Sequence, residues 1–302
     1  MTDFPIEMLR SVDFHVPDVD RAVDFYTRVW GLDLADRSGG SAWLRATGSD
    51  CHVLALHGGD AACRSTTYRA APAADLEALA WHMAAATGST ARAIGPINDH
   101  GGGIGFAARD RVGRTVRVVQ HDDRATPLPG DQGRPERLAH VNINSDDVAR
   151  DIGFYVEGMG FKLTDRSKMM GFVRTNSDHH TVVIADAPVN TLNHVAFLLP
   201  SWEGVMIASG RMVDRGDPIG WGPGRHGPGD NVFAYFVSPD GFVVEHTAEV
   251  LQVDDGYRVG GPEDWTWPPG RTDQWGICPP KTGACKAAQL AIPFADTHAG
   301  DN

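Results

Sequence analysis

Hydrophobic and polar positions alternate along this 302-residue chain in short, repeating blocks. In the second half, residues 146–155 (DDVARDIGFY) have helical spacing, with acidic residues in the first turn as suits a helix N-terminus. From residue 192 a strand, a helix and two strands follow, in the order already seen for the segments between residues 138 and 186. Four neighbouring segments alternate or run apolar as strands do: residues 138–143, 160–166, 169–175 and 180–186. The pattern predicts βαβββ modules.

The first half repeats this order at an offset of 129 residues. GLDLADR (31–37) matches GFKLTDR (160–166), and the pair Phe25-Tyr26 matches Phe154-Tyr155. Two matches at one offset indicate a duplicated domain. We therefore predict an α+β fold of four βαβββ modules paired into two domains, with modules near residues 8–57, 64–121, 138–186 and 192–249.

Composition sets the expected domain boundaries. Residues 1–121 form the predicted first domain and residues 138–250 the second. The segment 122–137 is polar and rich in Pro and Gly, as a linker should be. Residues 251–302 are rich in Trp, Pro and Gly without periodicity, so we expect an irregular tail that wraps the second domain.

Charge and composition exclude several classes of partner. The formal net charge is −12, with no basic run long enough to follow a phosphate backbone, which argues against nucleic acid. No segment approaches the roughly 20 apolar residues needed to cross a bilayer. The first residues, MTDFPIEMLR, lack the features of an export signal, and four cysteines are too few for a disulfide framework. We expect a cytoplasmic protein that binds neither membrane nor nucleic acid.

Three residues of the second half could bind a metal. His140 and His194 stand early in the first strands of modules three and four, and Glu245 lies in the last strand of module four. A carboxylate inside an apolar strand is costly to bury without a partner. Two histidines and one carboxylate on one face of a metal leave up to three positions open, the arrangement that suits non-haem Fe(II) with substrate and O₂.

The motifs around these residues resemble those of the two-domain type I extradiol dioxygenases of the vicinal oxygen chelate superfamily. The segment GPGRHGPGDNVFAYFVSPDGFVVEH (222–246) carries a histidine, a tyrosine and a carboxylate spaced nine and ten residues apart. They are His226, Tyr235 and Glu245. In addition, His180 precedes His194 by fourteen residues, as the acid–base histidine of that family precedes its second ligand.

The resemblance implies an enzyme that binds one Fe(II), or Mn(II), and opens an aromatic diol next to the hydroxyl pair with both atoms of O₂. It implies His180 as the acid–base residue, and His226 and Tyr235 as groups that hydrogen-bond the substrate or the activated oxygen. A symmetric homo-oligomer is also expected, because family members often assemble that way. In the first half the ligand positions align with Ser11, residues 66–69 and Arg117, which predicts a domain without metal.

Neighbouring residues complete the expected site. Asn142 lies two residues after His140 and so on the same strand face, where its amide could orient the substrate. His179 and His246 should point away from the metal if they lie on strands. Trp221 occupies the position of an arginine found in relatives that take carboxylate-bearing catechols, which suggests a neutral ring substituent, although Arg225 keeps a charged contact open.

Other residues and other functions remain as alternatives. Met169, Met170 and Phe172 favour core packing over lining a pocket, and Trp265, Trp267 and Trp275 could either cover the site or pack on the domain. A glyoxalase-like metal-dependent isomerase is the second function, and a ligand-binding protein without catalysis the third. The concentration of candidate ligands in one half favours the dioxygenase.

Overall fold

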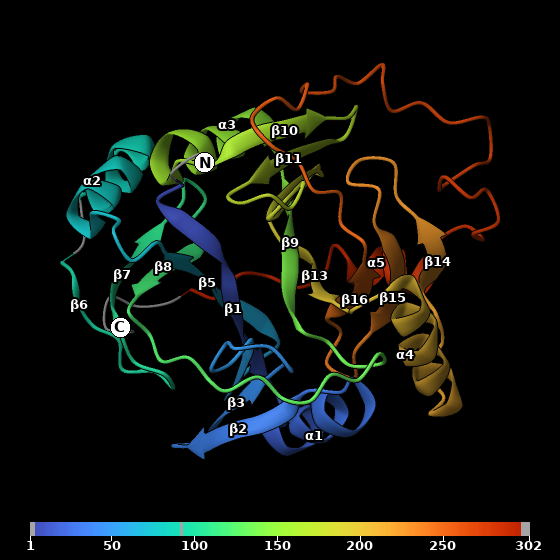
Figure 1. The fold of residues 1–302 in the computed structure, drawn as a ribbon, viewed down its shortest axis with the longest axis horizontal. Coiled ribbons are helices and arrows are strands. Elements are labelled where there is room, and N and C mark those ends of the chain that lie inside the picture. The colour runs from blue at the N-terminus through green and yellow to red at the C-terminus, as the bar shows by residue number, and fades with distance from the viewer. Residues whose placement is uncertain (1–3, 91–92, 297–302) are drawn as a thin grey trace.

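The computed structural model describes residues 4–90 and 93–296 and contains, within them, two eight-stranded sheets (Figure 1). The first consists of β1 (Ile6–Val16), β2 (Asp33–Ser38), β3 (Ser41–Arg45), β4 (Leu54–Gly58), β5 (Ala62–Ala70), β6 (Gly95–Pro96), β7 (Ile104–Arg109) and β8 (Thr115–Gln120). The second consists of β9 (Arg137–Ser145), β10 (Lys162–Arg166), β11 (Met170–Arg174), β12 (Val182–Asp186), β13 (Leu192–Leu198), β14 (Trp221–Arg225), β15 (Val232–Val237) and β16 (Val243–Ala248).

The two sheets have the same topology. Their strand orders are β2-β3-β4-β1-β5-β8-β7-β6 and β10-β11-β12-β9-β13-β16-β15-β14, so each strand of one has a counterpart in the other. In each sheet two modules meet at their first strands, because β1 pairs antiparallel with β5 and β9 with β13. The predicted α+β fold of paired βαβββ modules is confirmed.

Capping side chains begin the helices where the sequence pattern changes. The helical elements are α1 (Val19–Asp24), α2 (Leu76–Thr87), α3 (Val148–Gly153), α4 (Trp202–Asp214) and α5 (Gly283–Ala288), and π-helical turns η1 (Phe25–Val29) and η2 (Phe154–Gly158) extend α1 and α3. Asp18 and Asp147 cap α1 and α3 at equivalent positions of the repeat. The repeated Phe-Tyr pairs open η1 and η2 and are buried, which explains their recurrence.

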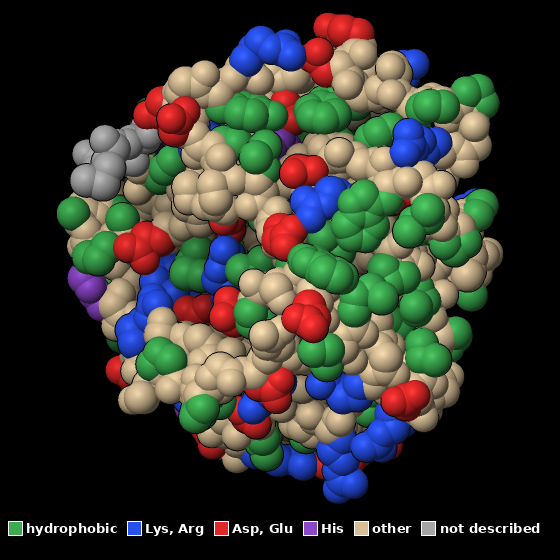
Figure 2. Space-filling model, turned by 45° about the vertical axis from the view of Figure 1, so that its right-hand side comes forward, with side chains coloured by type: hydrophobic (Ala, Val, Ile, Leu, Met, Phe, Trp, Pro, Cys, Tyr) green, Lys and Arg blue, Asp and Glu red, His purple; other side chains and the backbone are tan. Residues whose placement is uncertain are grey.

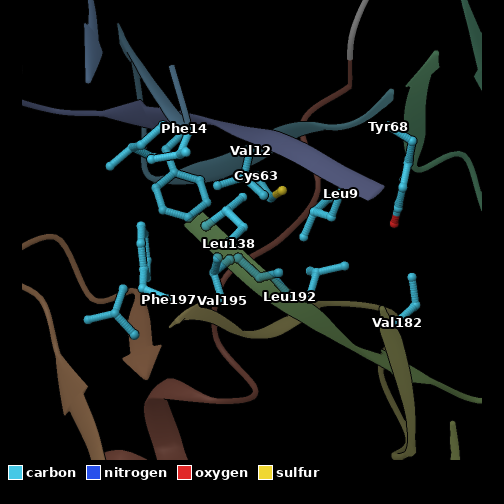
Figure 3. Close-up of a cluster of buried hydrophobic side chains, with 14 of the residues drawn as sticks. Leu9, Val12, Phe14, Cys63, Tyr68, Leu138, Val182, Leu192, Val195 and Phe197 are labelled. Atoms are coloured by element: carbon cyan, nitrogen blue, oxygen red, sulfur yellow. The ribbon is translucent and has the colours of Figure 1, made fainter. Parts of the chain in front are cut away.

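A shared core joins the two sheets. Side chains of β1 and β5, among them Leu9, Val12 and Phe14, face side chains of the second sheet such as Val195 and Phe197 (Figure 3). At the edge of this core the Trp30 ring from the first half stacks on the His246 ring of β16, with centroids 3.7 Å apart. The domains therefore hold each other through apolar contact, and His246 is used for packing.

The C-terminal tail contacts both sheets. Isolated β-bridges join Gly260 to Asp165 and Ile292 to Leu192 of the second sheet, and Phe294 to Cys63 of the first. The face over the tail and β14 gathers many hydrophobic side chains (Figure 2). The tail was expected to wrap the second domain as irregular structure; it contains the short helix α5 and also reaches the first sheet. No helix in the described part of the chain is long and apolar enough to span a membrane.

Candidate metal centre

Strand pairing places the candidate residues on one face of the second sheet. His140 on β9 lies opposite Ala196 on β13, which pairs with Glu245 on β16; Glu245 in turn pairs with Tyr235 on β15, and Tyr235 with Trp221 on β14. Directly paired residues point to the same face of a sheet. The methyl group of Ala196 leaves the space between His140 and Glu245 open, which the sequence motifs alone did not reveal.

The three predicted ligands converge on one point. The Nε2 atoms of His140 and His194 are 3.2 Å apart, and they lie 3.2 and 3.0 Å from Glu245 Oε2. Three ligands on one face of an octahedral ion with bonds of about 2.1 Å are separated by about 3.0 Å, whereas tetrahedral ligands would be about 3.4 Å apart. The observed separations of 3.0–3.2 Å lie at or between these values, so the three atoms can bind one divalent ion together. Two histidines and one carboxylate are the ligand types of facial sites that leave positions open.

Burial and charge favour a cation between these groups. All three side chains are buried, and Glu245 Oε2 accepts no well-aligned hydrogen bond. Although burial alone would raise it, the facing His140 and His194 hold the pKa of Glu245 well below its ordinary value. Burial lowers the pKa of His194 to about 4, so its imidazole is neutral and available as a ligand.

A hydrogen-bond chain orients His194. Its Nδ1 donates to Asn193 Oδ1 at 2.8 Å, which directs the Nε2 lone pair toward Glu245. Gln289 Nε2 from the tail donates to the same Asn193 oxygen at 2.6 Å, and Asn193 Nδ2 donates to Asn144 Oδ1 at 2.8 Å. Neither Asn193 nor Gln289 was predicted, because their role arises from contacts between distant segments.

A cavity of about 350 Å³ opens beside the centre. This volume is at the lower end of small-molecule sites and suits a single substituted ring. Asn142 Oδ1 is buried without a hydrogen-bond partner among the described residues. Every other residue predicted for catalysis or substrate binding also lines the cavity: His180, Trp221, His226 and Tyr235.

His226 and Tyr235 form a pair at the cavity wall. His226 Nε2 lies 3.0 Å from the Tyr235 hydroxyl, and the His226 ring stacks on Phe233. Burial lowers the pKa of His226 to about 3 and raises that of Tyr235 well above its usual range. Both groups are therefore neutral hydrogen-bonding partners at physiological pH.

His180 ends a buried chain that begins at Asp165. Asp165 Oδ2 lies 2.7 Å from His179 Nε2, and His179 Nδ1 lies 3.0 Å from His180 Nδ1. A carboxylate only accepts, so His179 donates from Nε2, accepts at Nδ1, and leaves His180 with its proton on Nδ1. The Nε2 of His180 is then an unprotonated base for the cavity.

His179 was expected to point away from the metal on condition that it lies on a strand; that condition is not met, and its ring contacts the ring of His180. Residues 178–181 precede β12 and are not part of a regular strand, so side chains there do not alternate between faces. Burial, together with the neighbouring His140 and His179, lowers the pKa of His180 well below its ordinary value.

The first domain fills the equivalent space with a guanidinium. The row Ser11–Thr67–Arg117 of the first sheet corresponds to the row His140–Ala196–Glu245 of the second. Arg117 Nη1 lies 3.0 Å from Asp13 Oδ2 and 3.1 Å from Asp99 Oδ2. A side-chain cation thus occupies the position where the second domain has a metal-ligand set.

The counterpart of His194 differs by one position from the expected range 66–69. Ser65 pairs with Asp13 as His194 pairs with Asn142, and these pairs are related by the offset of 129. Ser65 Oγ donates to Asp13 Oδ2 at 3.1 Å. A serine at this place offers a hydroxyl instead of an imidazole nitrogen.

Several further residues reach the cavity. Met169, Met170 and Phe172 line it; Met169 is 61% exposed, so the preference for core packing was wrong for that residue, whereas Phe172 is buried. The tail tryptophans could either cover the site or pack on the domain; Trp265 and Trp267 line the cavity. The following tail residues join them: Thr272, Lys281 and Gln289.

Trp275 and Arg225 lie apart from the cavity lining. The Arg225 guanidinium is 5.5 Å from the centroid of the Trp275 ring and pairs with Glu249 and Asp230. The charge of Arg225 is therefore already balanced by two carboxylates. It does not supply the charged substrate contact that its position in the sequence had left open.

Curated relatives share part or most of the chain. Metapyrocatechase 2 from Cupriavidus necator is 30% identical over 139 residues, which are 45% of this chain and 41% of that protein. A manganese-dependent 2,3-dihydroxybiphenyl 1,2-dioxygenase from Geobacillus genomosp. 3 is 25% identical over 274 residues, covering 82% of this chain and 85% of that one. These names agree with the predicted resemblance to type I extradiol dioxygenases.

A solved structure matches nearly the whole chain, and a family model matches both halves. A crystal structure described as the Mn(II)-bound glyoxalase from Novosphingobium aromaticivorans is 31% identical, covers 98% of this chain and 97% of its own, and superposes with a TM-score of 0.84. The model of the Glyoxalase/Bleomycin resistance protein/Dioxygenase superfamily matches residues 9–122 and 137–246. The chain belongs to this superfamily.

Proposed function

We propose that the protein is an extradiol dioxygenase that inserts both atoms of O₂ into a catechol-type diol next to its hydroxyl pair, in aromatic compound catabolism. His140, His194 and Glu245 would hold one Fe(II) or Mn(II) ion. The observation that carries the proposal is the facial spacing of these ligands beside a cavity of about 350 Å³. Three open positions on the ion suit a diol bound by two oxygens and one molecule of O₂.

The bound ion would supply Lewis acidity and a template for the diol, lowering the pKa of its hydroxyls. His180 presents an unprotonated Nε2 that can accept a hydroxyl proton, and Asp165 stabilises the resulting imidazolium through His179. His226 and Tyr235 offer neutral donors at the cavity wall. The Asn142 amide can orient the substrate ring from the same strand as His140.

A second candidate is a metal-dependent glyoxalase-type isomerase. It is favoured by the 31% identity of the Novosphingobium aromaticivorans protein over nearly the whole chain. Against it stands the distribution of ligands, since the cluster of candidate metal ligands found in the described residues lies wholly in the second domain. The first domain offers the Arg117 guanidinium at the equivalent place, which repels a metal ion.

Anaerobic loading separates the two functions. The protein is loaded with Fe(II) or with Mn(II), freed of excess metal, and mixed with air-saturated buffer and a series of catechols. A yellow ring-opened product formed with consumption of one O₂ per diol supports the dioxygenase. Isomerisation of the methylglyoxal–glutathione hemithioacetal without O₂ consumption, and no product from any diol, would favour the isomerase.

The variant His180→Gln tests whether His180 acts as the general base in ring opening. It should retain the metal, because His180 is not one of the three converging ligands. Turnover should fall by about 10²- to 10⁴-fold, as expected for loss of a general base. Wild-type turnover by this variant would remove His180 from the mechanism.

The cellular setting is also part of the proposal. Iron as the bound metal, with manganese possible, a cytoplasmic location and a symmetric homo-oligomer are proposed together with the function. Support for the choice of metals comes from the ligand set, which suits both ions. Metal analysis of protein purified without added metal, and light scattering, would test the metal and the oligomeric state.

A further inference from the structure

The tail places a lysine over the inner wall of the cavity. Lys281 directly precedes Thr282, which caps α5 by accepting a hydrogen bond from Cys285 N. Its ammonium lies 4.4 Å from the centroid of the Trp221 ring and 5.6 Å from that of Tyr235. The Lys281 Nζ donates to Gln289 Oε1 at 2.5 Å. Helix α5 thus fixes a cation next to two predicted substrate-binding residues.

The charge of this lysine is not balanced inside the cavity. Among the described residues lining the cavity, two are basic, Lys168 and Lys281, and none is acidic. Lys281 forms no ion pair with any carboxylate of the described chain; it contacts an amide oxygen and two aromatic rings. The protein as a whole carries a formal charge of −12, so a basic cavity runs against its composition.

Such a cation has a physical cost that a ligand could offset. Burial lowers the pKa of Lys281, which means that the protein environment disfavours its charged form. Aromatic faces, one amide oxygen and the more distant Glu245 carboxylate, with which Lys281 forms no ion pair, compensate only in part. An anion bound in the cavity would restore a full partner, and the concentration of positive charge there would also draw anions from solution.

We infer that Lys281 is a specificity-determining residue that binds an acidic substituent, a carboxylate, on the ring of the diol. The inference rests on the proposed dioxygenase function and names its substrate class. It also corrects the expectation of a neutral substituent: Trp221 replaces an arginine in the sequence, but the tail brings a cation onto the face of that tryptophan. The ring would lie between the metal ligands and Lys281.

Two matched pairs of substrates test the effect of the substituent's charge alone. We would compare 3,4-dihydroxyphenylacetate with its carboxamide, and 2,3-dihydroxyphenylpropionate with its carboxamide. The side chain is adjacent to the hydroxyl pair in the second acid and one carbon further round the ring in the first. Wild type should favour the carboxylate of at least one pair by about ten- to hundredfold in kcat/KM, the range of a hydrogen bond to a charged group. Lys281→Met should abolish this preference by weakening the carboxylate and leaving the carboxamide within about threefold.

Control variants separate a binding role from a structural one. Lys286→Met removes the same charge from an exposed position of α5 outside the cavity and should keep the wild-type preference. Lys281→Gln retains a group that can donate to Gln289 and should still lose the preference. Equal carboxylate-to-carboxamide ratios in wild type, Lys281→Met and Lys281→Gln would overturn the inference.

Anaerobic calorimetry of the Mn(II)-loaded protein measures the same preference without turnover. If the wild type opens no diol, the proposed function is overturned; Kd values for the pair still show whether Lys281 selects the carboxylate. If the wild type opens diols without regard to charge, the function stands and the role of Lys281 falls. Absence of both turnover and binding for all four compounds would overturn both.

Discussion

Replacing Asp165 with asparagine should reverse the hydrogen-bond chain that ends at His180. Asp165 is fully buried; its Oδ1 accepts from Gly260 N at 2.6 Å, and its Oδ2 accepts from His179 Nε2 at 2.7 Å and from the Tyr257 hydroxyl at 3.1 Å. An asparagine that keeps its oxygen on Gly260 presents an NH₂ group to His179. His179 must then accept at Nε2 and donate from Nδ1, which forces the proton of His180 onto Nε2.

The expected magnitude follows from the role assigned to His180. With Nε2 protonated, His180 can no longer accept a proton from the diol at the start of the reaction. Loss of a general base is worth about 10²- to 10⁴-fold in kcat. The reversed chain keeps its hydrogen bonds but loses the negative charge of Asp165, so the free energy of unfolding should fall by about 1 kcal/mol, the difference between a hydrogen bond to a charged group and one to a neutral group. The three metal ligands take no part in this chain, so metal content should stay the same.

Steady-state oxygen uptake with a diol, together with metal analysis of the same preparation, measures both quantities. Tyr257→Phe is the matched control, because it removes one hydrogen bond from the same carboxylate without changing which nitrogen of His179 carries the proton. Its kcat should stay within about tenfold of wild type. An Asp165→Asn variant with full metal content and a kcat as high as that of Tyr257→Phe would refute the reasoning.

Two further predictions concern the metal and acid stability. Glu245→Gln should lower metal affinity by more than about 100-fold, since even residues that only orient ligands are worth about 10- to 100-fold; metal content after dialysis checks this, and retention of stoichiometric metal would contradict it. Burial lowers the pKa of His194 to about 4 and of His226 to about 3, so below about pH 6.5 the unfolded chain binds more protons. The free energy of unfolding of metal-free protein should therefore fall by about 2 kcal/mol for each of these histidines from pH 8 to pH 5. Denaturant titrations at both pH values measure the loss, which His226→Phe should reduce; equal stability at both pH values would contradict the assignment.

The fold was predictable from the sequence because each module repeats a local pattern. The Phe-Tyr pairs recur since both are buried at the start of η1 and η2, and the offset of 129 follows from the identical strand order of the two sheets. The converging side chains of His140, His194 and Glu245 were indicated by motif spacing, which reflects fixed positions on neighbouring strands.

The tail and the segment around His179 were not predictable in the same way. Lys281 and Gln289 reach the cavity through packing of a segment without periodicity, and nothing local in the sequence determines where such a segment lies. For His179, strand alternation was assumed where the chain is irregular. In both cases contacts between distant residues, which a single sequence does not display, decide the geometry.

The guanidinium of Arg117 has a consequence for how the protein would respond to loss of its proposed metal ion. It gives the first domain a covalently attached positive charge where the second domain would have a bound ion. Without the ion, the buried Glu245 Oε2 would lack a well-aligned partner in the second domain, so hydrogen exchange in the chelated protein should quicken around β9, β13 and β16 while β1, β5 and β8 keep their protection. The first domain would then stay ordered, and keep supporting the second, when the second has no bound ion.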